Sequence, residues 1–137
     1  MFEKILLAFD GSEESKRATE VARDLATLSK GEVLVYHVVE REVGHAGVFE
    51  LETPDEATEI VDAAVGTLKD GGISARGEVN RGIHGRAAKE ILAEAKSFGA
   101  GIVVMGSRGR SELSGMLVGS VAHKVIHLAD CPVVVVR

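Results

Sequence analysis

Residues 106–120 read Gly-Ser-Arg-Gly-Arg-Ser-Glu-Leu-Ser-Gly-Met-Leu-Val-Gly-Ser, a glycine- and serine-rich segment between two apolar stretches. The stretch before it, Ile102–Met105, is short and rich in β-branched residues, which is typical of a buried strand. The stretch after it, Ser120–Leu128, has apolar residues at helical spacing. Open α/β sheets bind ligands at such strand-to-helix turns. The segment therefore predicts an α/β fold and the place of its ligand site.

The composition of this segment favours a phosphate group as the ligand. Gly106, Gly109 and Gly119 permit positive φ angles and a close approach of the backbone to a ligand. The N–H groups at the start of the following helix, with the positive end of its dipole, attract an anion. Arginines and serines add charge and hydroxyl donors, at Arg108, Arg110, Ser111, Ser114 and Ser120. We interpret the segment as a nucleotide-phosphate cradle.

Strand and helix patterns alternate along the whole chain, which predicts one α/β domain over residues 1–137 with a parallel sheet. Apolar runs predict strands at Lys4–Phe9, Glu32–Val39, Ile73–Val79, Ile102–Met105 and Val133–Val136. Amphipathic patterns predict helices at Glu13–Ser29, from Pro54 to just before Gly71, at about Arg86–Phe98, and at Ser120–Leu128. Ser12 and Thr53 are expected to cap the first two helices, and residues 40–52 to form a loop.

Composition argues against two classes of partner. The net charge is −5 and aromatic residues make up 4% of the chain, which suits neither a nucleic-acid backbone nor base stacking. No apolar stretch approaches the roughly 20 residues of a membrane span, and the first residues do not form a secretory signal. The single cysteine, Cys131, excludes an internal disulfide and is expected to be a buried, unreactive thiol. We therefore expect a cytoplasmic protein with no nucleic-acid or membrane partner.

Several catalytic and binding motifs are absent. The chain has no P-loop, no Gly-x-Gly-x-x-Gly after its first strand, and no Gly-x-Ser-x-Gly elbow. His123 and His127 have a metal-ligand spacing but lack the glutamate of a zinc-protease motif, and their place at a helix end suits the dipole. His37 lies within a predicted strand and is interpreted as a packed or hydrogen-bonded core histidine.

The chain resembles the universal stress protein family over essentially its whole length. The resemblance rests on the opening Lys4–Ser12, on the strand Val35–Val38, and on Val104–Gly109. Its most specific feature is the spacing Gly106-x2-Gly109-x9-Gly119-Ser120, which in that family marks the ATP-binding branch.

The resemblance implies a Rossmann-like fold, similar to the adenine nucleotide alpha hydrolases, with an open parallel five-stranded sheet of order 3-2-1-4-5 and helices on both faces. It also implies a homodimer in which the last strands, here Val133–Val136, meet. An uncovered apolar edge strand would otherwise promote aggregation. Two positions depart from the family pattern: Gly101, where an acidic residue is common, and His84, where proline is frequent.

The family's nucleotide-binding residues carry over position by position. Asp10 would accept hydrogen bonds from the ribose hydroxyls, and Ala8, Phe9 and Val38 would flank the adenine. The remaining positions would surround the sugar and the phosphates, with helix-start N–H groups and a hydroxyl among them: Met105, Gly106, Arg108, Gly109, Gly119, Ser120 and Val121.

The resemblance thus implies a dimeric stress-response sensor or switch that binds ATP, with Mg²⁺ or Mn²⁺ held through the phosphates. Since no dedicated catalytic base is evident, hydrolysis is expected to be slow at most. Two alternatives remain open. One is a genuine ATPase or nucleotide-dependent transferase using Asp10, Arg108 and Ser120. The other is a partner-binding protein that uses the dimer edge or the loop Gly44–Glu52 and carries a vestigial nucleotide site.

Overall fold

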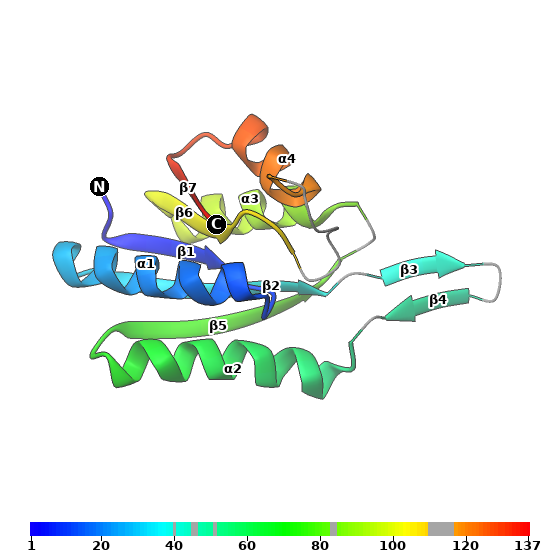
Figure 1. Cartoon of the computed structure of the whole chain (residues 1–137), viewed down its shortest axis with the longest axis horizontal. Coiled ribbons are helices and arrows are strands. Elements are labelled where there is room, and N and C mark those ends of the chain that lie inside the picture. The colour runs from blue at the N-terminus through cyan, green and yellow to red at the C-terminus, as the bar shows by residue number, and fades with distance from the viewer. Residues whose placement is uncertain (40, 45–46, 51, 83–84, 110–116) are drawn as a thin grey trace.

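Five parallel strands form the central sheet of the computed structural model, which describes residues 1–39, 41–44, 47–50, 52–82, 85–109 and 117–137 (Figure 1). Their order is β5-β2-β1-β6-β7, which confirms the predicted order 3-2-1-4-5. The strands are β1 (Lys4–Ala8), β2 (Glu32–Val39), β5 (Ser74–Arg81), β6 (Ile102–Gly106) and β7 (Val133–Val136). The helices are α1 (Glu13–Ser29), α2 (Pro54–Asp70), α3 (Ala87–Phe98) and α4 (Ser120–Leu128).

Helices cover both faces of the sheet, so its central strands are apolar on both sides. In β1, Ile5 and Leu7 pack in the core beneath α1 and α2, whereas Leu6 and Ala8 pack beneath α3 and α4. Ile5, Leu6 and Leu7 are fully buried. This two-sided burial is the physical reason for the continuous apolar runs in the sequence.

Side-chain caps fix the starts of α1 and α2, as predicted. The Ser12 hydroxyl accepts from the Ser15 N–H at 3.2 Å. The Thr53 hydroxyl accepts from the Glu56 N–H at 3.2 Å, while the Glu56 carboxylate accepts from the Thr53 N–H at 3.2 Å. This reciprocal pair is a capping box, with Pro54 in the first helical turn.

The prediction of a loop over residues 40–52 was wrong for eight of these residues, because β3 (Arg41–Gly44) and β4 (Gly47–Glu50) pair as an antiparallel hairpin that projects from the body of the molecule (Figure 1). Residues 40, 45–46 and 51 lie outside the described residues. Gly44 and Gly47 pair with each other across the two strands, so these glycines do not mark irregular chain. β5 also runs to Arg81, beyond the predicted Val79, because its ladder with β2 continues to Val39.

Among the described residues, no helix is both long enough and apolar enough to cross a membrane. The carboxyl ends of β1, β2 and β6 lie at one edge of the sheet, beside the start of α4 and the base of the hairpin (Figure 1).

Two glycines provide a matched test of this packing. A Cβ at Gly77 in β5 would overlap Val61 Cγ1 of α2, a buried β-branched side chain with little rotamer freedom. A Cβ at Gly66, on α2 itself, would meet nothing within 4 Å. We expect Gly77→Ala to destabilise the protein by about 1–3 kcal/mol and Gly66→Ala to stabilise it by roughly 0.5–1 kcal/mol. Denaturant unfolding measures both, and a Gly77→Ala protein as stable as the wild type would contradict the packing.

Candidate functional site

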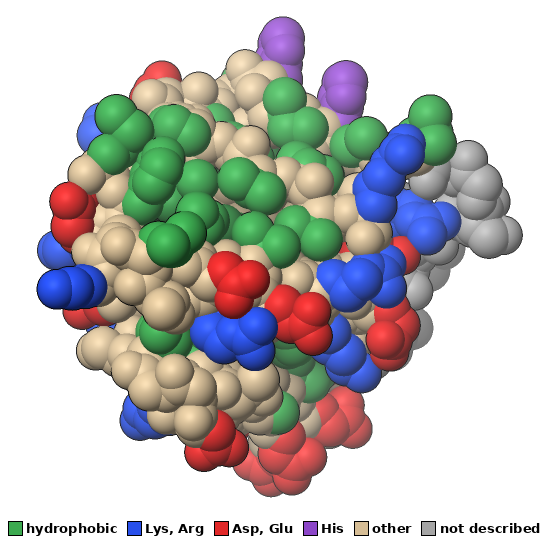
Figure 2. Space-filling model, turned by 60° about the vertical axis from the view of Figure 1, so that its left-hand side comes forward, with side chains coloured by type: hydrophobic (Ala, Val, Ile, Leu, Met, Phe, Trp, Pro, Cys, Tyr) green, Lys and Arg blue, Asp and Glu red, His purple; other side chains and the backbone are tan. Residues whose placement is uncertain are grey.

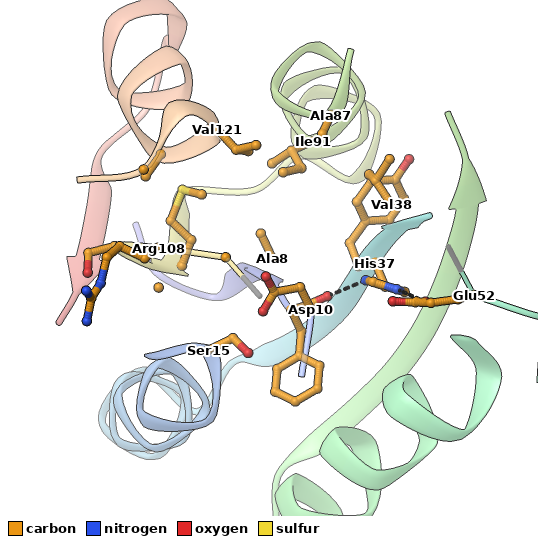
Figure 3. A pocket seen from close by; sticks show the side chains of 18 residues that line it. Ala8, Asp10, Ser15, His37, Val38, Glu52, Ala87, Ile91, Arg108 and Val121 are labelled. Carbon is orange, nitrogen blue, oxygen red and sulfur yellow. Dashed lines mark hydrogen bonds and ion pairs between the residues drawn. The ribbon is translucent and has the colours of Figure 1, made fainter. Parts of the chain in front are cut away.

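A cavity of about 320 Å³ opens at the carboxyl ends of β1, β2 and β6 (Figure 3). This volume lies within the range of small-molecule sites, roughly 300–1,000 Å³. All of the predicted site residues except Ser120 line it, namely Ala8, Phe9, Asp10, Val38, Met105, Gly106, Arg108, Gly109, Gly119 and Val121. The other lining residues are Ser15, Tyr36, His37, Glu52, Ala87, Ile91, Ser107 and Ala122.

One part of the cavity is apolar. Ala8 and Val38 lie at its floor, Ile91 faces them from α3, and Val121 closes it from α4 (Figure 3). These side chains are supplied by four different elements of the fold, and they converge because α3 and α4 cover the same face of the sheet. Such a surface suits a flat, largely apolar ring.

Asp10 stands at the opposite, polar part of the cavity. Its carboxylate accepts from the Ser12 N–H at 2.9 Å, which closes an Asx turn directly after β1. Gly11 completes this turn with φ +83°. Gly119, whose φ is −73°, does not use the positive φ that glycine permits, whereas Gly11 does.

Gly106 permits a close contact between the end of β6 and the first turn of α1. A Cβ at this position would lie 2.8 Å from Glu14 Cβ and 2.9 Å from the Ser15 nitrogen. The backbone of α1 cannot yield to such a contact, so only glycine fits. The need for glycine at this point thus arises from packing as well as from any ligand.

The start of α4 differs from the capped starts of α1 and α2. Its N-cap is Gly119, which has no side chain with which to cap the helix. The Gly119 N–H donates to the Ser107 carbonyl at 2.6 Å, which anchors the turn to the end of β6. Val121 and Ala122, in the first turn of α4, line the cavity. First-turn N–H groups and the helix dipole favour a negatively charged ligand at this point.

Arg108 contributes to the cavity wall, but its guanidinium is engaged elsewhere. It donates to Glu14 Oε1 at 2.8 Å, and Figure 3 shows the side chain directed away from the centre of the cavity. The Ser12 hydroxyl donates to the Arg108 carbonyl at 3.4 Å. Hydrogen bonding by the Glu14 backbone and the neighbouring Arg108 guanidinium lowers the pKa of Glu14, against the opposing effect of desolvation. Phosphate contact by Arg108 stays a prediction.

His37, Glu52 and Tyr36 are cavity residues that the sequence did not assign to the site. His37 is buried and hydrogen-bonded, which confirms the interpretation of it as a core histidine. Glu52 lies near the base of the hairpin, and no sequence pattern links it to His37. The Tyr36 hydroxyl accepts from Asn80 Nδ2 at 2.6 Å, and burial raises its pKa, which keeps it neutral.

The other sequence candidates lie outside this cavity or outside the described chain. Cys131 is half-buried, and burial raises the pKa of its thiol. Among the described residues, no three His, Cys, Asp or Glu side chains cluster as metal ligands would. Arg110, Ser111, Ser114 and His84 lie outside the described residues.

Comparison with known proteins decides the family. The universal stress protein family matches residues 1–137 of this chain. The chain belongs to the universal stress protein family. It is 34% identical to universal stress protein YxiE of Bacillus subtilis, with all of both chains covered. Universal stress protein MJ0577 of Methanocaldococcus jannaschii is 29% identical, and its solved structure superposes with a TM-score of 0.82 over 99% of this chain and 96% of that one.

Two other structures of the family were solved with adenine nucleotides. A universal stress protein from Archaeoglobus fulgidus in complex with dAMP has a TM-score of 0.72, covers 100% of this chain and 98% of its own, and is 23% identical. A universal stress protein in complex with cAMP has a TM-score of 0.71, covers 99% and 97%, and is 22% identical. Family members therefore bind adenine nucleotides, and at these identities the likeness to this chain is one of fold.

The contact between Arg108 and Glu14 can be tested by titrating the Glu14 carboxyl with NMR. We expect its pKa below the ordinary value of 4.5 in the wild type. In Arg108→Gln the pKa should rise but stay below 4.5, because the backbone hydrogen bond, the largest cause of the shift, remains. Arg17→Gln is the control, since its guanidinium lies farther from Glu14, at 3.7 Å. An unchanged Glu14 pKa in Arg108→Gln would contradict the ion pair.

Proposed function

We propose that the cavity binds an adenine nucleotide, that its ligand is ATP, and that the chain belongs to the ATP-binding branch of its family. The observation that carries this proposal is the start of α4, which has no side-chain cap and opens on a cavity with an apolar floor. The spacing of Gly106, Gly109, Gly119 and Ser120 supports it, as do the dAMP and cAMP complexes of other family members.

The base and the ribose occupy the part of the cavity between the strands and α3. Adenine lies over Ala8 and against Val38, where apolar side chains suit its faces. Phe9 adjoins it through its backbone, because the Phe9 side chain packs in the core beneath α1 and α2. The Asp10 carboxylate accepts from the ribose hydroxyls, since charged acceptors form the stronger hydrogen bonds. Met105 and Gly106 flank the sugar and the first phosphate.

The phosphates extend toward α4. N–H groups of Ser120 and Val121 and the Ser120 hydroxyl donate to them. Gly109 and Gly119, which line the cavity, allow the backbone to approach them closely. Arg108 reaches them by exchanging its contact with Glu14 for one with phosphate. Mg²⁺ or Mn²⁺ binds through the phosphate oxygens and reduces the repulsion between them.

The protein acts as a sensor or switch with slow hydrolysis at most. Rapid phosphoryl transfer needs a group that orients water. Both ring nitrogens of His37 lie within hydrogen-bond distance of other atoms, and the Asp10 carboxylate accepts from Ser12. Because of these contacts, neither the His37 ring nor the Asp10 carboxylate is placed to act as a general base that orients the attacking water. ATP turnover by the wild type well above that of Asp10→Asn would favour a genuine ATPase instead.

We also propose a homodimer through β7. The Pro132 and Val136 carbonyls accept hydrogen bonds from N–H groups of β6 and the residue after it. Alternate residues of a strand bond to opposite sides, so Val133 and Val135 direct their backbone N–H and C=O groups away from β6. Figure 2 shows apolar side chains gathered on one face of the molecule. Ile126 and Leu128 of α4 are about half exposed, at 50% and 49%. A second copy would pair with this edge and cover these side chains.

Calorimetric titration with ATP and Mg²⁺ tests the nucleotide site. Asp10→Asn keeps an oxygen for the Ser12 N–H but loses the charge offered to the ribose, so we expect roughly 10–100-fold weaker binding. Gly119→Val should weaken binding at least as much, because its side chain would stand where the phosphates approach. Gly66→Ala, outside the cavity, is the control. Wild-type affinity in both cavity variants would contradict the assignment.

Sedimentation of wild type and Val135→Pro tests the dimer. Proline at 135 removes an N–H that points away from β6, so the sheet keeps its ladder while the outer edge loses a donor. We expect the variant to dissociate at concentrations where the wild type is dimeric, with its circular dichroism unchanged. A variant as dimeric as the wild type would show that copies meet at another surface.

A further inference from the structure

A hydrogen-bonded pair, His37 and Glu52, connects the base of the hairpin to the floor of the cavity (Figure 3). His37 Nδ1 lies 2.7 Å from the Phe9 carbonyl oxygen, and His37 Nε2 lies 2.7 Å from Glu52 Oε2. The side chains are 3% and 12% exposed. Residues from β1, β2 and the hairpin end thus meet in one chain of contacts beside Asp10.

The two contacts fix the proton count of the pair. A backbone carbonyl only accepts hydrogen bonds, so His37 Nδ1 must carry a hydrogen. At 2.7 Å, Nε2 and the carboxyl oxygen also need a hydrogen between them, because a lone pair facing a carboxylate would be repelled. The pair therefore holds one proton more than a neutral imidazole and an ionised carboxylate would. With that proton it is neutral overall, and without it the pair carries one negative charge.

We propose that His37 and Glu52 are positioning residues for nucleotide binding. The inference rests on the proposed function. His37 donates to the carbonyl of Phe9, the residue directly before Asp10, and Glu52 in turn holds the His37 ring. The pair thereby sets the orientation of the turn that offers the Asp10 carboxylate to the ribose. Loss of the Glu52 carboxyl breaks this chain of contacts, whereas a glutamine amide at the same position keeps it.

The test is calorimetric titration of ATP and Mg²⁺ into wild type, Glu52→Gln, Glu52→Ala and Glu59→Gln. A glutamine amide donates to the Nε2 lone pair of a neutral imidazole, so Glu52→Gln keeps the hydrogen bond without the extra proton. Glu59→Gln removes an equal charge from the exposed face of α2 and is the control.

We expect Glu52→Gln and Glu59→Gln to bind ATP about as tightly as the wild type, and Glu52→Ala to bind it roughly tenfold more weakly, because His37 Nε2 loses its hydrogen-bond partner. Equal affinity of all four proteins would overturn the inference and leave the nucleotide site intact. No binding by the wild type would overturn the proposed function, and this inference with it. The unfolding midpoint of each variant reports whether it is folded.

A spectroscopic readout accompanies the affinities. Nitrogen chemical shifts of the His37 ring should show Nδ1 protonated in wild type and in Glu52→Gln, since Nδ1 faces the Phe9 carbonyl. Equal affinity of the two Glu52 variants, or an unprotonated Nδ1 in the wild type, would contradict the positioning role.

Discussion

The carboxyl end of β6 packs directly on the first turn of α1, and the site depends on that contact. Gly106 meets the backbone of Glu14 and Ser15 at distances that no side chain would allow. Because these two segments touch, the Arg108 guanidinium reaches Glu14 and the Ser12 hydroxyl reaches the Arg108 carbonyl. The turn after β1 and the turn after β6 are thereby held together, and the cavity lies between them and α4.

The cavity combines three environments that rarely occur together in a small space. The floor of the cavity is apolar because β1 and β2 are buried strands. At the start of α4, first-turn N–H groups and the helix dipole favour a negative charge. Beside the turn after β1, the cavity carries the Asp10 carboxylate. A ligand that satisfies all three has a flat ring, hydroxyl donors and an anionic tail. Nucleotides have this order of groups, which is why the family's adenine nucleotide complexes are informative here.

Local signals in the sequence predicted the strands and the ends of most helices, whereas the order of the sheet was implied by the family resemblance. Buried runs such as Ile5–Ala8 and caps such as Ser12 and Thr53 act over a few residues. Most of the predicted site residues line the cavity because parallel strands bring their carboxyl ends to one edge. The hairpin was missed because Gly44 and Gly47, which pair in it, also occur in loops. Glu52 was missed because its partner, His37, lies 15 residues away. The partner of Arg108 was missed for the same reason, since Glu14 is 94 residues distant.

The most direct test of the central claim is an amide NMR titration of the wild-type protein with ATP and Mg²⁺. Binding in the cavity predicts saturable shifts concentrated at the residues after β1, at Val38, at Gly106–Gly109 and at Gly119–Ala122. Amides of α2, such as that of Gly66, should not move. Shifts centred on another surface, or none at millimolar ATP, would contradict the claim that this cavity is an adenine nucleotide site.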